Sequence, residues 1–176
     1  QEGILRYYDE FSSKMFGIIR MGTVLGHNMP EKTAANIFIN QGLSGKPITP
    51  FKHTMYRPML YVDVHDICKA FKNFIDKVFD GNYPSNGNSL DHIVNVYNKT
   101  PITILDLAHI VKDSIKLKTN GSINPTVTVV DKGLPLVFQD NSIDQIDVDI
   151  DKSINLLKLE SLTRTKDSIN NIVEFH

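Results

Sequence analysis

Apolar residues recur at helical spacing in several segments of the chain, and strand-like runs separate those segments. A period of 3.6 residues predicts a helix, and a short run rich in Ile and Val predicts a strand. Helices are expected at residues 1–13, at 31–43 after Pro30, from Asp66 to residue 78, at 104–115 and at 165–175. Strands are expected in "MFGIIRMGTVLG" (15–26), "MLYV" (59–62), "HIVNVYN" (92–98) and "NPTVTVVDK" (124–132).

Polar residues mark where several of these helices begin. Thr103 and Asp106 have the spacing of a capping box, in which each side chain bonds the backbone of the other. Asp66 suits the N-cap of the helix that follows "MLYV", and Thr165 suits the N-cap of the final helix. The helix boundaries are therefore expected at these positions.

The remaining segments are loops or mixed. "DGNYPSNGNS" (80–89) has the composition of a loop, and "KPITPF" (46–51) is expected to be a short extended stretch. "GLPLVFQDNS" (133–142) is irregular, whereas "IDVDIDKSINLLKL" (146–159) begins with strand-like alternation and turns helical near Asp151. Strands and helices alternate along the chain, which favours an α/β layered domain.

Composition and charge are ordinary for a soluble protein. Of the 176 residues, 41% are hydrophobic and 22% are charged, and no apolar run approaches the roughly 20 residues that span a bilayer. The net charge of -1 provides no overall field that would recruit nucleic acid or an anionic membrane. A single cysteine excludes an internal disulfide and a thiolate metal cage. The cytoplasm is the expected location.

The chain lacks several motifs that hold a dinucleotide or perform catalysis. "GLSGKP" does not have P-loop spacing, and neither GxGxxG nor GxSxG occurs. The Tyr-x-x-x-Lys acid/base pair of many carbonyl reductases and sugar epimerases is also missing, since Phe11 and Ser12 stand four residues after Tyr7 and Tyr8. The residues predict a binding half without a visible reaction centre.

An acidic run near residue 150 imitates the start of a calcium loop. Asp147, Asp149 and Asp151 alternate as its ligands do, but Lys152 and Lys158 stand where that loop requires glycine and glutamate. Apolar residues intervene between the acids, so we interpret the run as a strand with a solvated acidic face.

A second polar cluster follows the strand "MLYV". His65 and Asp66, together with Asp63 and Tyr61, have the residue types of a base, an orienting acid or metal ligands. Capping of the next helix is the simpler role for Asp66. Cys68 sits one residue beyond an apolar helix position, which favours packing over nucleophilic chemistry.

Arg57 stands just before an apolar strand, between Tyr56 and Pro58. A guanidinium group can make a planar, two-pronged contact with phosphate or carboxylate, which a lysine cannot reproduce. Arg57 is therefore the preferred candidate for a local anion site.

Four segments match patterns of one known family. "IIRMGTVLG" resembles R-x-x-N-V-Y-G-P, and "MPEKTAANIFINQGLSGKPITPF" resembles a stretch of sugar-nucleotide 4,6-dehydratases that reads roughly P-E-K, apolar helix, G-K-P. "YRPMLYVDVHDICKAF" resembles R-D-W/F-L/I-Y/H-V-x-D-x-A-x-A, and "IVNVYNKTPITILDLAHIV" resembles Y-N-I/V-G followed by an apolar helix. In this order they resemble the carboxyl-terminal half of the extended short-chain dehydrogenases/reductases, the NAD-dependent nucleotide-sugar epimerase/dehydratase family.

The resemblance implies a set of site residues. In that family the amino-terminal half carries the NAD loop and the Tyr-x-x-x-Lys pair, and the later half contributes substrate-binding elements. The implied positions are Thr23 facing the sugar, Val24 where the backbone approaches the nicotinamide, Lys32 and Thr33 along the diphosphate and nucleoside, Phe51 stacking on the base, Arg57 on the diphosphate, and Asn95 at the end of a central strand.

The sequence departs from the family pattern at several of these places. Thr23 replaces an asparagine, and Tyr97 replaces a glycine and is expected to crowd the pocket. Residues 62–66 look two residues longer than the pattern, which predicts a rebuilt turn. Where the family usually offers a second phosphate-binding arginine, only Asn141 and Ser142 are available. Diphosphate binding would then depend on a single arginine.

Together these features predict an α/β fold made of the last Rossmann strands and the small substrate-binding subdomain. Residues 1–176 would form the substrate-binding half, with 1–26 and 88–118 contributing to the Rossmann-like layer. The chain starts at Gln1 in helical periodicity and lacks an initiator methionine, so we expect a fragment cut from something longer.

The expected partners follow from the same resemblance. The parent protein would use NAD to take and return hydride, while this chain binds the nucleotide-sugar, holds no NAD or metal alone and shows no turnover. A homodimer through the first helix is expected, and nucleic acid and membrane are not expected as partners. The rival hypothesis is a non-catalytic module for small-molecule sensing or protein interaction, derived from the same half-fold.

Overall fold

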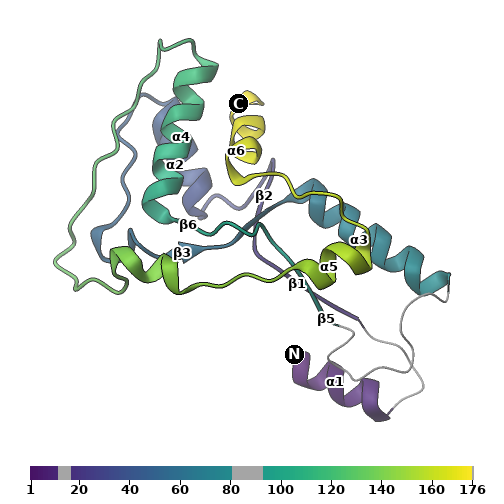
Figure 1. Ribbon diagram of the computed structural model, residues 1–176. Helices are drawn as coiled ribbons and strands as arrows, with labels where there is room; N and C mark the ends of the chain where they lie inside the picture. The colour runs from purple at the N-terminus through teal and green to yellow at the C-terminus, as the bar shows by residue number, and fades with distance from the viewer. Residues whose placement is uncertain (12–16, 81–92, 176) are drawn as a thin grey trace.

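Helices and short strands alternate in the computed structural model, which describes residues 1–11, 17–80 and 93–175 (Figure 1). The helices are α1 (Glu2–Phe11), α2 (Ala34–Leu43), α3 (Val64–Phe79), α4 (Ile104–Lys118), α5 (Asp151–Leu157) and α6 (Thr165–Glu174). The strands are β1 (Ile18–Met21), β2 (Thr23–Leu25), β3 (Pro58–Met59), β4 (Tyr61–Asp63), β5 (Ile93–Val96) and β6 (Ile102–Thr103). Short 3-10 helices occupy Lys52–Thr54 and Asp140–Gln145.

Two parallel strand pairs lie at the centre of the molecule. β1 pairs with β5, with Ile18 opposite Ile93, and β2 pairs with β4, with Thr23 opposite Tyr61. β3 and β6 add a short antiparallel pair. The α/β class predicted from the sequence is confirmed.

Gly22 separates β1 from β2 and lets the chain change its pairing partner. The Gly22 N–H donates to the Val96 carbonyl at 3.3 Å, and the next N–H, from Thr23, donates to the Leu60 carbonyl at 2.8 Å. A Cβ atom at Gly22 would lie 2.4 Å from the Leu60 carbonyl oxygen, which only glycine avoids. The single buried strand predicted over residues 15–26 is therefore two strands, and β1 ends on exposed residues.

Helices α2, α4 and α6 form a wall on one side of the strands, with α4 in contact with the other two (Figure 1). Their inward residues recur at helical spacing, and α4 begins with the predicted capping box of Thr103 and Asp106. The buried core of this wall includes Ala35, Phe38, Ile39, Leu107, Ala108, Val111, Ile115, Ile169, Ile172 and Val173.

A second core joins β5 to helices α3 and α5. Val62, Ile67 and Ala70 pack here with Val94 and Val96, and Leu157 and Leu159 close the cluster. Helix α1 lies at the opposite end of the molecule from the helical wall (Figure 1).

Several predicted boundaries are wrong. Residues 124–132 form no strand and make only isolated bridges from Val127 and Val130 to the 48–51 stretch. Residues 146–150 are likewise not a strand. Residues 81–89 of the predicted loop lie outside the described ranges. Among the helices of the described ranges, none is both long and apolar enough to cross a membrane.

Candidate functional site

A cavity of about 270 Å³ runs between one face of α2 and the segment that carries Arg57. Residues four or three apart on a helix share a face, and Ala34, Ile37, Phe38 and Gln41 form the α2 side of this cavity. The remaining lining residues are Lys32, Thr49, Pro50, Phe51, Thr54, Arg57 and Ile104.

A second cavity of about 230 Å³ adjoins the first and reaches strands β2 and β4. Its lining residues are Thr23, Val24, Leu25, Met29, Thr33, Ala34, Ala35, Arg57, Met59, Tyr61 and Ile104. Ala34, Arg57 and Ile104 line both cavities. The two cavities therefore meet beside Arg57.

Arg57 is held in place by its backbone and offers its side chain to the cavities. It follows a 3-10 turn, in which its N–H donates to the Thr54 carbonyl at 2.9 Å, and it precedes β3. Its side chain is exposed, and no carboxylate of the described residues forms an ion pair with it. A guanidinium group that has no carboxylate partner in the described part of the chain, and that lies where two cavities meet, suits an anionic ligand.

The start of α2 adds to the positive character of this place. Thr33 caps the helix, because its hydroxyl oxygen accepts from the Asn36 N–H at 3.4 Å and its hydroxyl donates to the Pro30 carbonyl at 2.9 Å. Lys32 immediately precedes this cap and lines the first cavity. The helix dipole and the lysine both favour negative charge near Arg57.

Tyr61 presents a neutral phenol to the second cavity. It is 3% exposed, and burial raises the pKa of its hydroxyl to about 12, although the nearby Arg57 charge opposes that rise. The phenol therefore remains a hydrogen-bond donor throughout the neutral range. The sequence suggested Tyr61 only as a member of the polar cluster with Asp63, His65 and Asp66, and its place beside the Arg57 cavity was not predicted.

Phe51 lies on the rim of the first cavity, where other side chains cover parts of its ring. It is 45% exposed, and the His53 ring stacks on it with a centroid distance of 5.8 Å and an angle of 15°. The Lys132 Nζ lies 5.4 Å from the ring centroid. Lys52 beside it pairs with Asp131 at 2.8 Å, which ties the 127–132 segment to this rim.

Asn95 does not belong to either cavity. It lies on β5 opposite Arg20, and its N–H donates to the Ser153 hydroxyl at 2.8 Å. The structure thus gathers Thr23, Val24, Lys32, Thr33, Phe51 and Arg57 around the two cavities and leaves Asn95 outside them. The roles implied for these residues stay predictions.

No protein-family model matches the sequence, and no curated protein sequence matches it. Solved structures do match. UDP-glucuronic acid 4-epimerase from Bacillus cereus, in complex with UDP-glucuronic acid and NAD, is 19% identical with a TM-score of 0.65 over 99% of this chain and 50% of that one. UDP-glucose 4-epimerase from Thermotoga maritima, with UDP-glucose, is 17% identical with a TM-score of 0.69 over 99% and 50%.

A dehydratase gives the same result. dTDP-glucose 4,6-dehydratase from Bacillus anthracis, in complex with NAD, is 13% identical with a TM-score of 0.70 over 99% of this chain and 48% of that one. The fold is that of the carboxyl-terminal half of the extended short-chain dehydrogenases/reductases. The chain spans about half the length of the solved structures that it matches.

The structure gives the positions of three expected departures from the family pattern. β4 ends at Asp63 and α3 begins at Val64, so the strand leads directly into the helix, and a turn rebuilt relative to the family pattern stays a prediction. Tyr97 lines neither of the two cavities and packs instead against the core beside β5. Asn141 and Ser142, in the place of the second arginine, also lie outside both cavities.

Asp63 and His65, at the junction of β4 and α3, interact with each other. The His65 side chain is 82% exposed, and its Nδ1 lies 2.9 Å from the Asp63 carboxylate, which is 7% exposed. Burial raises the pKa of the Asp63 carboxyl, but contacts with the Ser168 hydroxyl and His65 outweigh it and leave that pKa below its ordinary value. Asp63 is a buried carboxylate that anchors the start of α3, where it also accepts the His65 N–H at 2.9 Å.

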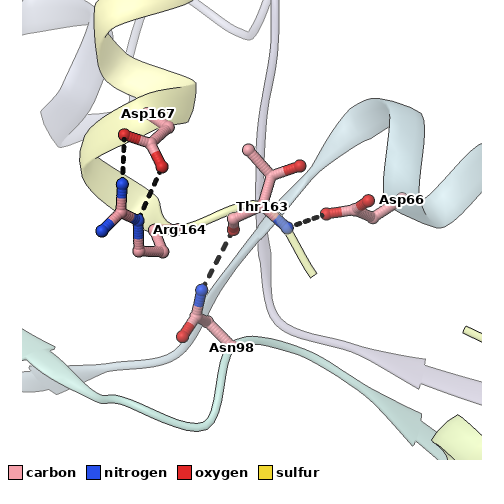
Figure 2. Close-up of polar contacts among 5 residues, drawn as sticks. All are labelled: Asp66, Asn98, Thr163, Arg164 and Asp167. Carbon is pink, nitrogen blue, oxygen red and sulfur yellow. Dashed lines mark hydrogen bonds and ion pairs between the residues drawn. The ribbon is translucent and has the colours of Figure 1, made fainter. Parts of the chain in front are cut away.

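Asp66 is not the N-cap that was predicted. It lies inside the first turn of α3, and its carboxylate accepts the Thr163 N–H at 2.7 Å (Figure 2). Asn98 donates to the Thr163 carbonyl at 3.0 Å, so both residues hold the linker between α5 and α6. Arg164, rather than Thr165, is the N-cap of α6, and its side chain pairs with Asp167 at 2.7 Å.

The structure also shows the surroundings of Cys68 and of the acidic run near residue 150. Cys68 is exposed, so the interpretation that it packs in the core is wrong. Asp151 pairs with Lys99 and donates its N–H to the Asp149 carboxylate at 2.8 Å.

Proposed function

We propose that this chain is the substrate-binding portion of an NAD-dependent nucleotide-sugar epimerase or dehydratase. The observation that carries the proposal is the meeting of two cavities at Arg57, whose guanidinium group has no carboxylate partner among the described residues. The positive start of α2 lies beside it, which suits a diphosphate. The likeness to half of several epimerases and a dehydratase supports the same function.

The two cavities suit the two ends of such a ligand. The cavity beneath β2 and β4 is lined by Thr23, Thr33 and the Tyr61 phenol, which are hydrogen-bonding groups appropriate for a sugar. The cavity along α2 has a largely apolar lining that suits a nucleoside base. Arg57 between them would hold the diphosphate.

NAD would belong mainly to the part of the protein outside this chain. The chain has no glycine-rich dinucleotide motif, and among the proposed site residues only Val24, in a cavity of about 230 Å³, is assigned to the cofactor. These residues fit one edge of a dinucleotide rather than the whole group. When bound, NAD would take and return a hydride at the sugar. Residues 1–26 and 88–118 would contribute to the Rossmann-like layer.

Calorimetric titration of UDP-glucose tests the diphosphate role. Arg57→Ala should weaken binding by about 2 kcal/mol, because a charge-assisted contact to phosphate is lost. Arg164→Ala is the matched control, since that exposed arginine already pairs with Asp167 at 2.7 Å and should leave affinity unchanged. Equal heats from the wild type and Arg57→Ala would contradict the proposal.

The sequence of the encoding gene distinguishes the proposed enzyme from the rival function, a non-catalytic sensing or interaction module. A glycine-rich loop and a Tyr-x-x-x-Lys pair encoded directly upstream would establish the enzyme. A start codon directly upstream without those motifs would establish the module.

We also propose that α1 mediates a homodimer of the protein. Its outward residues Ile4, Tyr7, Tyr8 and Phe11 are 63%, 60%, 53% and 72% exposed. A helix face with this much apolar surface is typical of a protein interface. A second copy of the same helix would cover it in a symmetric pair.

A further inference from the structure

The cavity beneath β2 and β4, which is proposed to hold the sugar, has a mostly apolar wall. Strand β2, the loop after it, the first turn of α2, strand β3 and the start of α4 all contribute to this wall. Its apolar residues are Val24, Leu25, Met29, Ala34, Ala35, Met59 and Ile104. Its other residues are Thr23, Thr33, Arg57 and Tyr61, which provide all of the polar side chains of the wall.

Only part of this polar capacity is available to a ligand. The Thr33 hydroxyl already donates to the Pro30 carbonyl at 2.9 Å and accepts the Asn36 N–H at 3.4 Å, because it caps α2. Within the described ranges, the hydroxyls of Thr23 and Tyr61 form no hydrogen bond to another residue. These two hydroxyls can bond a sugar, and they are fewer than the hydroxyls of a glucosyl group.

The charge of the wall is limited in the same way. Among the described residues that line this cavity, Arg57 alone is charged, and its guanidinium group is assigned to the diphosphate. Lys32 lines the cavity along α2 and not this one. A carboxylate on the sugar would therefore share Arg57 with the phosphates, which repel it, or would remain without a cation. A carboxylate removed from water without a paired cation is unfavourable.

Met29 and Met59 give the wall its flexible apolar surface. Both side chains are half-buried, and they come from the loop before α2 and from β3. An unbranched thioether adapts its shape to an apolar neighbour. A methyl group gains from such a contact, whereas a hydroxyl would give up its bonds to water for it. The wall therefore suits a sugar that has lost an oxygen.

We propose that this wall takes a deoxysugar, with a methyl group where a hexose has a hydroxymethyl group, and rejects a uronic acid. This selection depends on the proposed function, because the sugar reaches the cavity only when the diphosphate lies at Arg57. Met29 and Met59 determine specificity in this arrangement. The selection would distinguish this chain from the Bacillus cereus epimerase of similar fold, which was solved in complex with UDP-glucuronic acid and NAD.

Calorimetric titration with UDP-6-deoxyglucose, UDP-glucose and UDP-glucuronic acid tests the selection, since these ligands differ only at the exocyclic carbon of the sugar. The wild type should bind UDP-6-deoxyglucose about threefold more tightly than UDP-glucose, and UDP-glucuronic acid about tenfold more weakly than UDP-glucose. Binding of UDP-glucuronic acid as tight as that of UDP-glucose would overturn the proposal. Weaker binding of UDP-6-deoxyglucose than of UDP-glucose would also overturn it.

Met29→Lys places a cation in the wall with a side chain of similar length. It should strengthen the binding of UDP-glucuronic acid about tenfold and should not strengthen that of UDP-6-deoxyglucose. The Met29 N–H donates to the Gly26 carbonyl at 3.3 Å and its carbonyl accepts from the Asn36 amide at 3.1 Å, and neither bond involves the replaced side chain. Circular dichroism checks that the variant folds.

Met21→Lys is the matched control. Met21 lies on β1, is 44% exposed and lines neither cavity, so the same added charge should leave the ratios of the three affinities unchanged. If Met29→Lys does not fold, the order of the three ligands in the wild type decides the proposal. An unchanged affinity for UDP-glucuronic acid in folded Met29→Lys would overturn the place of the sugar in this cavity.

Failure of the selection is distinguishable from failure of the proposed function. Equal affinities of the wild type for the three ligands, all weakened by Arg57→Ala, would overturn the selectivity of the wall and leave the diphosphate site standing. Absence of binding by all three ligands would overturn both.

Discussion

The helical wall and helix α1 both carry apolar residues at helical spacing, but their apolar faces have different surroundings. In the wall, Leu107, Val111 and Ile115 are 0% exposed, because α2 and α6 cover the face of α4 that carries them. In α1, Ile4 is 63% exposed and Phe11 is 72% exposed. Periodicity therefore identifies the apolar side of a helix without revealing what covers it.

The largest expected effect comes from removing a side chain from the wall. Ile115→Ala should lower the free energy of unfolding by about 2 to 5 kcal/mol, because the lost methyl groups leave a cavity in a close-packed core. Ile4→Ala in α1 should change the free energy of unfolding of the monomer by less than about 0.5 kcal/mol, since that side chain is exposed in the single chain. Urea unfolding followed by circular dichroism measures both. Similar losses from the two variants would remove the distinction between the regions.

The next largest expected effect is on self-association through helix α1. Phe11→Glu should weaken self-association by about 2 kcal/mol, roughly thirtyfold in the dimer dissociation constant, because a charge replaces an aromatic ring that the second copy would bury. It should leave the unfolding of the monomer unchanged. Size-exclusion chromatography with light scattering gives the oligomeric state across a concentration series.

Leu117→Glu provides the control for that measurement. Leu117 lies near the end of α4 and is 69% exposed, so it is as accessible as Phe11 but belongs to the other region. Its replacement should leave the dimer intact. A wild-type chain that remains monomeric at every concentration would contradict the role of α1.

The sequence predicted the helices well because the buried residues of a helix recur three and four positions apart along the chain. The face of α4 and its capping box were both read from positions three and four residues apart, and the structure has them. The strand at 124–132 was wrong for the opposite reason. Whether a run rich in valine becomes a strand depends on a continuous partner, and here only Ile48 and Phe51 make isolated bridges to it.

Residue chemistry alone identified only Arg57 among the residues that line the two cavities, whereas the other expected positions came from the family resemblance. Arg57 was identified from its type and neighbours, and the structure leaves it without a carboxylate partner among the described residues. Gln41 and Thr49 line the first cavity and are joined by a 2.8 Å hydrogen bond, but they were missed because they are eight positions apart and have no pattern of their own. Only the folding of the 44–49 turn against α2 brings the amide and the hydroxyl together.

The smallest expected effect on stability distinguishes Thr103 from Thr165, two threonines of the wall that the sequence predicted as helix caps. Thr103 caps α4, because its hydroxyl oxygen accepts the Asp106 N–H at 3.0 Å, whereas Thr165 is the first residue of α6 and makes no cap. Each is 6% exposed, and a change to valine preserves its shape. Thr103→Val should therefore lower the free energy of unfolding by about 1 kcal/mol and Thr165→Val by less than about 0.5 kcal/mol. Thermal unfolding of the two variants measures the difference, and equal losses would mean that burial alone, without the capping box, stabilises the wall.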